Sequence, residues 1–370
     1  MGTLKKNTVL LGMSGGTDSS VAAMLLQEAG YKVTGVTFRF WDSPEFAETL
    51  IASPEALPSY IQEAKELAKS LNIEHFVYDA RTTFRTQIVD YFISEYMAGR
   101  TPVPCALCNN LLKWPLLAQL ADERGIEHIA TGHYVRLTES PSHRLFVRQG
   151  FDPDKDQSFF LWGLSEALLR RIIFPLGERT KTDVRAIAAA QGYQRVATKR
   201  DSLGVCFCPM DYRSFLRREL GTNAFYKGSF VDSKGNLLGQ HEGYPFYTIG
   251  QRRGLGIWLN RQLFVTDIRP QENEIVLGAI DDTARMEFDI CDWRSPDPAE
   301  LLSNPPELVV KIRYKKQLNH CRVSQYTTSQ GSHLHITLQE PLTAIAPGQA
   351  AAFYLGDRLL GGGIISGKNV

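Results

Sequence analysis

The stretch Gly12-Met13-Ser14-Gly15-Gly16-Thr17-Asp18-Ser19-Ser20 decides the fold of this chain. It follows an apolar, strand-like run at residues 8–13, and it opens a stretch of helical composition at residues 18–29. Glycines let backbone amides approach an anion, serine hydroxyls add donors, and a following helix presents its positive end. The stretch has neither the Gly-Lys-Ser/Thr end of a Walker loop nor the spacing of a dinucleotide loop. It predicts a phosphate-binding loop, with a simple helix-capping turn as the alternative.

The sequence on the C-terminal side of this loop continues to alternate between strand and helix patterns. Strands are predicted at residues 33–40, 74–78 and 128–137, and helices at 58–71, 84–97, 111–124 and 183–191. This alternation favours an α/β fold with a parallel sheet covered on both faces. From residue 225 onward, turn signals separate short strand-like runs, including residues 308–314, 333–338, 350–355 and 359–365. That half of the chain is predicted to form one or two small all-β modules.

Composition places the chain among soluble globular enzymes. Its 370 residues are 43% hydrophobic and 22% charged, which excludes a disordered chain, a coiled coil or a fibre. No run is long enough for a membrane span, and the apolar stretch near the N-terminus is too short for a signal peptide, so we expect a cytoplasmic protein without membrane contact. The net charge is +1, so any affinity for nucleic acid must come from local basic patches.

The six cysteines are not spaced like a disulfide scaffold. Cys105 and Cys108 form one close pair and Cys206 and Cys208 another, while the remaining two stand alone in the sequence. Two close pairs in a cytosolic chain indicate metal binding or thiol chemistry before they indicate structural bridges.

Several motifs together resemble one enzyme family. The Ser-Gly-Gly-x-Asp-Ser core of the loop resembles the signature of the N-type ATP pyrophosphatases (PP-loop superfamily), which adenylate an oxygen atom and expel pyrophosphate. Residues 99–109 resemble the Gly-Arg-Thr-Pro-Asn-Pro-Asp-x-x-Cys-Asn segment of the bacterial tRNA-uridine 2-sulfurtransferases, the MnmA/TrmU family. Further matches to that family follow in the same order at residues 130–134, 154–161, 201–207 and 247–257. The resemblance covers nearly the whole chain.

The resemblance implies three domains and a reaction. A PP-loop ATP-binding and catalytic domain is expected at residues 1–220, a small β-rich central domain at 221–285 and a tRNA-binding β-barrel at 286–370. ATP with Mg²⁺ would adenylate the C2 oxygen of the wobble uridine, position 34, in tRNAs for Lys, Glu and Gln. A persulfide donor or relay protein would supply the sulfur, and the enzyme would be a monomer. The ATP-binding residues implied are Gly12, Met13, Ser14, Gly15, Gly16, Thr17, Asp18, Ser19, Phe38 and Gly132.

The resemblance also assigns roles to the cysteines. Cys206 would carry the persulfide, and Cys108 would be the second catalytic cysteine, with a transient disulfide between them. Here the sequence departs from the family, because Cys105 replaces an aspartate and Val103 replaces an asparagine. The extra thiols open a rival interpretation, in which Cys105, Cys108, Cys206 and Cys208 are ligands of zinc or an iron–sulfur cluster, with the first three as the possible cluster ligands. The metal-free mechanism is favoured because the surrounding motifs follow the persulfide-using family.

The remaining implied residues would contact tRNA. Val103, Pro104 and Cys105 would lie against the target base. The other contacts implied by the resemblance are His133, Lys155, Asp156, Gln157, Arg313, Tyr314 and Gln349. A basic segment from Lys311 to Arg322, which includes Lys315 and Lys316, suits phosphate contact and base stacking, and the arginines near Cys206 are a second candidate patch. Two alternatives stay open: a PP-loop synthetase acting on a small molecule, and a tRNA-binding protein that has lost catalysis.

Overall fold

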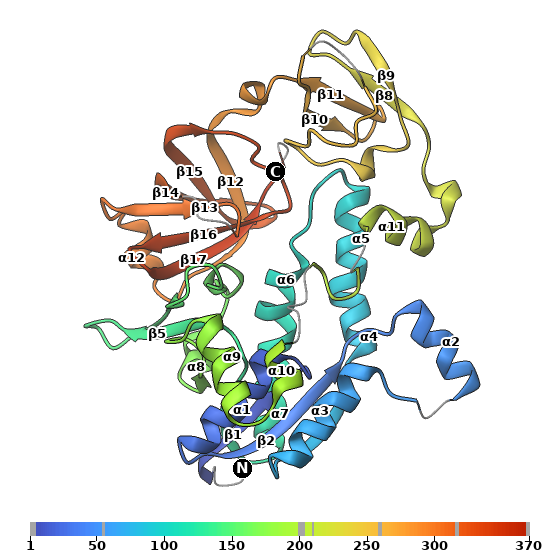
Figure 1. Cartoon of the computed structure of the whole chain (residues 1–370). Helices are drawn as coiled ribbons and strands as arrows, with labels where there is room; N and C mark the ends of the chain where they lie inside the picture. The colour runs from blue at the N-terminus through green and yellow to red at the C-terminus, as the bar shows by residue number, and fades with distance from the viewer. Residues whose placement is uncertain are drawn as a thin grey trace. The chain divides into compact units, whose positions relative to one another are not determined.

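Figure 1 shows the computed structural model of the chain, which describes residues 5–53, 56–198, 204–208, 211–257, 261–314 and 318–367. The chain forms two compact units. The first consists of Met1–Ile88, Cys105–Pro209 and Asp357–Leu359, and the second of Val89–Pro104, Met210–Gly356 and Leu360–Val370. In the described part of the chain, no helix is both long and apolar enough to cross a lipid bilayer.

A five-stranded parallel sheet forms the centre of the first unit, as predicted. Its order is β3-β2-β1-β4-β7, and its strands are β1 (Lys5–Gly12), β2 (Lys32–Arg39), β3 (Glu74–Asp79), β4 (Ile126–Ala130) and β7 (Ile172–Ile173). Val9, Leu10 and Leu11 in the central strand are fully buried. A strand covered on both faces is apolar throughout instead of alternating, which explains the continuous apolar run before the loop.

Helices cover this sheet and share its core. They include α1 (Thr17–Glu28), α3 (Ser59–Ser70), α7 (Trp114–Glu123), α9 (Lys181–Ala190) and α10 (Gln194–Thr198). Val21 of α1, Ala64 of α3 and Val184 of α9 belong to one buried cluster. An additional helix, α2 (Pro44–Ala52), forms in a segment for which the sequence analysis predicts no element. Ser43 caps it by accepting a hydrogen bond from the Phe46 amide at 3.2 Å.

The prediction of one strand over residues 128–137 is wrong. Strand β4 ends at Ala130, and β5 (Val135–Glu139) begins a hairpin with β6 (Leu145–Gln149) in another sheet. The chain turns at Gly132, where a Cβ atom would lie 2.7 Å from the Asp18 carbonyl carbon. The close packing of this turn against α1 ends the strand, and such a long-range contact has no local signature.

The second unit holds two β structures, in agreement with the predicted fold class. A small sheet of order β10-β11-β8-β9 contains β8 (Gly228–Val231), β9 (Leu237–His241), β10 (Phe264–Arg269) and β11 (Glu274–Gly278). The barrel strands are β12 (Arg285–Arg294), β13 (Leu308–Lys311), β14 (Asn319–Thr328), β15 (Gly331–Leu342), β16 (Ala350–Leu355) and β17 (Arg358–Ile365). The pairing of Ile290 with Ile365 closes the barrel. Leu334, Ile336 and Leu338 alternate inward along β15, as a one-sided strand requires.

Candidate active site

The predicted phosphate loop connects β1 to α1 at the carboxyl edge of the parallel sheet, where ligands bind in open α/β sheets. The Ser14 amide donates a hydrogen bond to Ser19 Oγ at 3.1 Å, and Ser19 Oγ donates to the Gly16 carbonyl at 3.2 Å. Ser20 Oγ donates to the same carbonyl at 2.7 Å. These contacts hold the loop in a compact turn against the first turn of α1, so its amides and hydroxyls are gathered at the positive end of a helix.

Close packing of backbone explains why two positions of the site are occupied by glycine. Gly15 has a φ of 68°, and a Cβ atom there would lie 2.5 Å from the Tyr60 carbonyl oxygen at the start of α3. A Cβ on Gly132 would lie 2.8 Å from the Ser19 amide nitrogen. Both distances are shorter than any real contact of a Cβ, so neither position tolerates a side chain without displacing backbone. The loop is therefore wedged between α3 and the turn after β4.

Asp18 is held by two residues to which the sequence analysis assigns no role. Its Oδ1 atom accepts a hydrogen bond from Lys181 Nζ at 2.7 Å and another from the Tyr134 hydroxyl at 2.7 Å. Lys181 is the first residue of α9 and is buried. Tyr134 lies inside a motif on which the family resemblance rests, so the sequence marked it as a candidate site residue. Nothing in the sequence marked Lys181, because it lies 163 residues from Asp18.

Phe38 and Met13 line the end of β2 beside the loop. Met13 is buried, and its sulfur lies 2.4 Å from the position that a Cβ on Gly35 would take. Phe38 is buried and stacks on Phe40 with ring centroids 5.2 Å apart. The structure thus places both residues in packed positions near the loop, and their contact with a nucleotide stays a prediction.

An aromatic row joins this strand end to the loop that carries Cys206. The Phe40 ring lies 5.1 Å from that of Phe84, and the Phe84 ring lies 5.6 Å from that of Phe207. Trp41 also contacts Phe207, edge to face, with centroids 6.1 Å apart. Because Phe207 is buried, these rings anchor the backbone directly next to the candidate persulfide carrier.

The structure brings Cys105, Cys108 and Cys206 into one electrostatic neighbourhood. Cys108 is buried, Cys105 is half-buried and Cys206 is exposed, and all three are free thiols. Desolvation raises the pKa of both Cys105 and Cys108, and the ammonium of Lys113 acts in the opposite direction. The pKa of Cys206 is raised to about 12, first by desolvation and then by the charges of Cys108 and Cys105.

Two conclusions follow from this thiol cluster. The solvent exposure of Cys206 limits the desolvation effect on its pKa, but the largest causes act toward the neutral thiol at all three cysteines, and the opposing charge of Lys113 is the smaller effect. Among the described residues, no group of three or more His, Cys, Asp or Glu side chains is placed to hold a metal ion.

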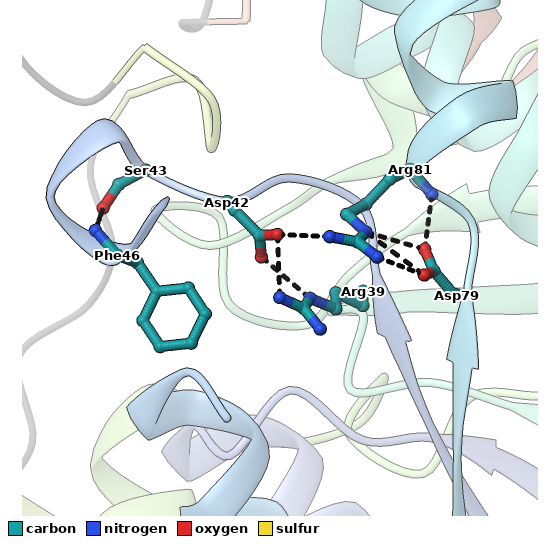
Figure 2. A network of polar contacts seen from close by, with 6 residues as sticks. All are labelled: Arg39, Asp42, Ser43, Phe46, Asp79 and Arg81. Carbon is teal, nitrogen blue, oxygen red and sulfur yellow. Dashed lines mark hydrogen bonds and ion pairs between the residues drawn. The ribbon is translucent and has the colours of Figure 1, made fainter. Parts of the chain in front are cut away.

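Figure 2 shows a network of ion pairs at the carboxyl ends of β2 and β3. Asp42 accepts hydrogen bonds from Arg39, with Nε–Oδ1 at 2.8 Å, and from Arg81, with Nη1–Oδ2 at 2.6 Å. Arg81 also pairs with Asp79 at 2.6 Å, and this bond lowers the pKa of Asp79. Burial and the charge of Asp42 raise the pKa of Tyr60 to about 12, and the charge of Cys206 contributes. The network and Cys206 therefore lie within electrostatic range of one phenol.

The remaining predicted tRNA contacts of the first unit have structural partners. Gln157 accepts a hydrogen bond from the Tyr134 amide at 3.0 Å, and Asp156 accepts one from the Ser158 amide at 3.1 Å. His133 bonds to the Thr131 hydroxyl, and desolvation lowers its pKa to about 3. These contacts order the turn after β4, so a role in tRNA binding stays a prediction for these residues and for Lys155.

In the second unit, a cavity of about 450 Å³ brings Arg313 and Gln349 together. Gln349 Nε2 donates to the carbonyls of Thr101 at 3.0 Å and Pro102 at 3.2 Å. Its amide therefore holds the backbone just before the predicted target-base residues Val103 and Pro104. Other residues lining the cavity are Thr248, Ile249, Gly250, Gln251, Ile312, Ala344 and Ala346.

In the described part of the predicted basic segment, Lys311 does not lie on the exposed surface. Lys311 is buried, and its ammonium lies 4.4 Å from the centroid of the Tyr354 ring, so its assignment to phosphate contact is wrong. Arg313 and Tyr314 are exposed, which fits the prediction for them without testing it. Lys315 and Lys316 lie outside the described residues, as do Lys199 and Arg200 near Cys206.

Three models of known protein families match successive parts of the chain. Residues 7–210 match the model of a tRNA methyl transferase HUP domain. Residues 213–279 match a tRNA methyl transferase PRC-barrel domain, and residues 285–365 match an aminomethyltransferase β-barrel domain. The three models follow one another in the order of the parallel sheet, the small sheet and the barrel.

Curated relatives match over the full length. The chain is 55% identical to tRNA-specific 2-thiouridylase MnmA 2 of Phocaeicola vulgatus, over 98% of this chain and 99% of that protein. It is 54% identical to MnmA 1 of Bacteroides fragilis, over 98% of each chain. It is 42% identical to MnmA 3 of the same species, over 98% of this chain and 95% of the relative. On the strength of these full-length matches and its ordered domains, the chain belongs to the tRNA-specific 2-thiouridylase (MnmA) family of the PP-loop superfamily.

Proposed function

We propose that this enzyme is an ATP-dependent tRNA-uridine 2-sulfurtransferase that makes 2-thiouridine at the wobble position. Family membership makes it a tRNA sulfurtransferase. The finer proposal covers the wobble uridine of tRNAs for Lys, Glu and Gln, activation by ATP, and a cysteine persulfide as sulfur source. It also keeps the division into residues 1–220, 221–285 and 286–370.

One observation carries the proposal: Tyr60 connects the phosphate loop to the thiol cluster within the first unit. Its carbonyl oxygen packs against Gly15 of the loop, and its phenol lies within electrostatic range of the Cys206 sulfur. A reaction that joins adenylation to sulfur delivery requires both sites near one target base. A small-molecule synthetase would have no use for the thiols, and a protein that only binds tRNA would have no use for either site.

The proposed steps balance as follows. The uridine C2 oxygen attacks the α-phosphorus of ATP, the bond to the β-phosphate breaks, and pyrophosphate leaves with the electron pair. Cys108 then attacks the inner sulfur of the Cys206 persulfide, which forms a Cys108–Cys206 disulfide and releases hydrosulfide. Hydrosulfide adds to the activated C2 and AMP leaves. An external thiol supplies the two electrons that reduce the disulfide.

The residues of the loop would serve the first step. Backbone amides at Ser14 and Gly15 and the hydroxyl of Ser19 would bind phosphate oxygens, helped by the positive end of α1. The Mg²⁺ that accompanies ATP would neutralise phosphate charge, and Asp18 is the carboxylate of the loop that fits it. Burial raises the pKa of the Cys108 and Cys206 thiols, so both would start neutral, and binding of tRNA or the donor would activate them.

One specific observation supports a second candidate. Cys105, which replaces the family's aspartate, lies within electrostatic range of Cys206, as does Cys108, so the first unit gathers three thiols in one neighbourhood. We keep the persulfide mechanism as the first candidate because the motifs around these cysteines follow the persulfide-using family. Cys105→Asp should retain or raise activity under that mechanism, whereas cluster ligation requires iron that is lost with activity in Cys105→Ser.

A sulfur-transfer assay tests the proposal. Anaerobically purified protein is given ATP, a ³⁵S-persulfide donor and a tRNA with uridine at the wobble position. The matched control is the same tRNA with cytidine there. We expect ³⁵S in the uridine tRNA alone, with one AMP formed for each sulfur. Transfer without ATP, or ATP cleavage that needs no tRNA but responds to a small acceptor, would contradict the proposal.

A further inference from the structure

Asn109 carries a buried polar group that the fold does not use. The residue directly follows Cys108 in the sequence and is only 5% exposed. Its Oδ1 atom is buried and has no hydrogen-bond partner among the described residues. A buried acceptor without a partner costs free energy, so native proteins rarely keep one without a reason. An orphaned acceptor beside a candidate catalytic cysteine therefore points to a ligand that offers a hydrogen-bond donor.

The helix around Asn109 has an unusual register. The short helix α6 (Pro104–Leu107) continues into a π-helical segment, η2 (Cys108–Lys113), and then into α7. Such π turns are rare and occur frequently at functional sites. Asn109 lies four residues after Cys105, a spacing that places two side chains on the same side of a helix. The amide thus shares a helix face with a half-buried thiol, and solvent reaches that face at the thiol.

The neighbouring Asn110 is used differently. Its Oδ1 atom accepts a hydrogen bond from the Gly163 amide at 3.1 Å, and a Cβ atom on Gly163 would lie 3.0 Å from the Asn110 Cβ atom. This close contact fixes the Asn110 side chain, although its Nδ2 atom has no partner among the described residues. Asn110 also lies one residue beyond the step that returns to the face of Cys105. Of the two asparagines, Asn109 is the one with an unused acceptor on that face.

The target base needs polar partners that two residues before Cys108 do not offer. Val103 has no polar side-chain atom, and the Cys105 thiol is a weak hydrogen-bond acceptor. Uracil presents an N3–H donor between the carbonyl oxygens O2 and O4, and O2 is the atom that is adenylated in the proposed reaction. A carboxamide matches the remaining edge, because its oxygen accepts from N3–H while its nitrogen donates to O4.

We propose that Asn109 binds the Watson–Crick edge of the target uracil through N3–H and O4, and thereby orients O2 toward the α-phosphorus of ATP. The inference rests on the proposed function and adds a specificity-determining residue to it. Side chains that cover Asn109 move aside as the base enters, and the new hydrogen bonds satisfy an acceptor that is otherwise unpaired. The same contact rejects a base whose edge lacks these groups, because the amide oxygen then stays unpaired.

A base analogue tests this contact. Pyrimidin-2-one keeps the reacting C2 carbonyl but lacks O4 and the N3 proton, and it is smaller than uracil, so it introduces no clash. The value of kcat/KM for pyrophosphate release is measured with tRNA that carries either base at the wobble position, in the unchanged protein and in Asn109→Leu. The intrinsic reactivity of each base cancels when the two base preferences are divided, as in a double-mutant cycle. Asn110→Leu is the matched control, and melting temperatures and persulfide loading of Cys206 report the fold of each variant.

We expect the preference for uracil over pyrimidin-2-one to be about 5- to 150-fold stronger in the unchanged protein than in Asn109→Leu, the range for one bidentate contact to a base. Asn109→Leu should melt no lower than the unchanged protein, since Oδ1 loses no hydrogen bond. Asn110→Leu should melt lower, because the Gly163 amide loses its acceptor, but it should keep the base preference.

Two results would contradict different parts of this scheme. The same base preference in the unchanged protein and in a folded Asn109 variant would overturn the inference, and Asn109→Ala provides that variant if Asn109→Leu does not fold. Absence of tRNA-dependent pyrophosphate release from the unchanged protein would instead overturn the proposed function on which the inference rests.

Discussion

The phosphate loop and the thiol cluster of the first unit are built in opposite ways. In the loop, residues close in sequence satisfy one another through short hydrogen bonds, and packed backbone surrounds them. The thiols come from segments about 100 residues apart, and their surroundings raise every pKa. The proposed ATP site is therefore ordered by its own contacts, whereas the thiols of the proposed sulfur site are held in the neutral form. Such an arrangement protects the thiols from unproductive chemistry.

The most severe test of the organised loop is Gly132→Ala. A Cβ atom there would lie within 2.8 Å of the backbone at Asp18 and Ser19, so the start of α1 must move. We expect about a 1,000-fold loss of pyrophosphate release, because displaced donors lose their alignment with the phosphates. Persulfide loading of Cys206 should stay unchanged. Gly367→Ala is the control, because a Cβ atom at Gly367 would meet open space. A similar loss of pyrophosphate release in Gly367→Ala would mean that the close packing at Gly132 is not the cause.

The ion pairs of Asp42 with Arg39 and Arg81 test how the loop that carries Cys206 is supported. The Asp42 and Arg39 side chains are only 11% and 13% exposed, so Asp42→Asn should lower the free energy of unfolding by about 3 kcal/mol. Because Trp41 next to it packs on Phe207, alkylation of Cys206 should become faster while ATP binding holds. Asp79→Asn is the matched control, with a loss under about 1 kcal/mol expected because Asp79 is 54% exposed. Equal losses in chemical denaturation would contradict this account.

The protonation state of Cys206 gives a third test. If its thiol pKa is raised, the thiolate fraction rises about tenfold per pH unit through pH 7 to 9. The rate of iodoacetamide modification, measured with Cys105 and Cys108 replaced by serine, should rise without a plateau over that range. Charges on Cys105 and Cys108 contribute to the raised pKa of Cys206. At pH 9 the modification rate should therefore be slower in the protein that keeps both of these cysteines. A plateau below pH 8 would mean that the thiol is already activated.

The smallest expected effect is on the pH dependence of the free energy of unfolding, and it comes from His133, in the turn that packs against the loop. Its folded pKa of about 3 lies below its unfolded value, so the unfolded state binds the extra proton first. Stability is therefore fully present above pH 6.5 and falls as the pH drops through that value. Between pH 7 and 6 the loss from this group is about 0.7 kcal/mol. His133→Asn should flatten the urea-unfolding profile by that amount, and an unchanged slope would mean that His133 is not buried as a neutral ring.

The same contrast explains what the sequence could predict. The loop from Gly12 to Ser20 was predictable because its strand, turn and helix signals are contiguous. The barrel strand at residues 350–355 was predicted with its observed bounds because its apolar run lies between clear turns. Lys181 was missed because its signal depends on a contact across 163 residues. The break after Ala130 was missed because only packing against Asp18 reveals it.

The basic segment shows the limit of composition. Lys311 belongs to a run of basic residues in the sequence, but every residue of β13 is buried, and the Lys311 ammonium lies 4.4 Å from the centroid of the Tyr354 ring. Cys105 shows the reverse case, because its spacing from Cys108 predicted a shared neighbourhood and the structure places it there.

The most direct test follows one ³⁵S atom through the Cys108→Ser variant. In the proposed mechanism, Cys206 accepts sulfur independently of ATP, and Cys108 is needed to release it. After incubation with a persulfide donor, ATP and tRNA, the label should stay on Cys206 of Cys108→Ser, and pyrophosphate should still appear. The unchanged protein should move the label to tRNA. Labelled tRNA from Cys108→Ser, in amounts equal to those from the unchanged protein, would contradict the two-cysteine mechanism.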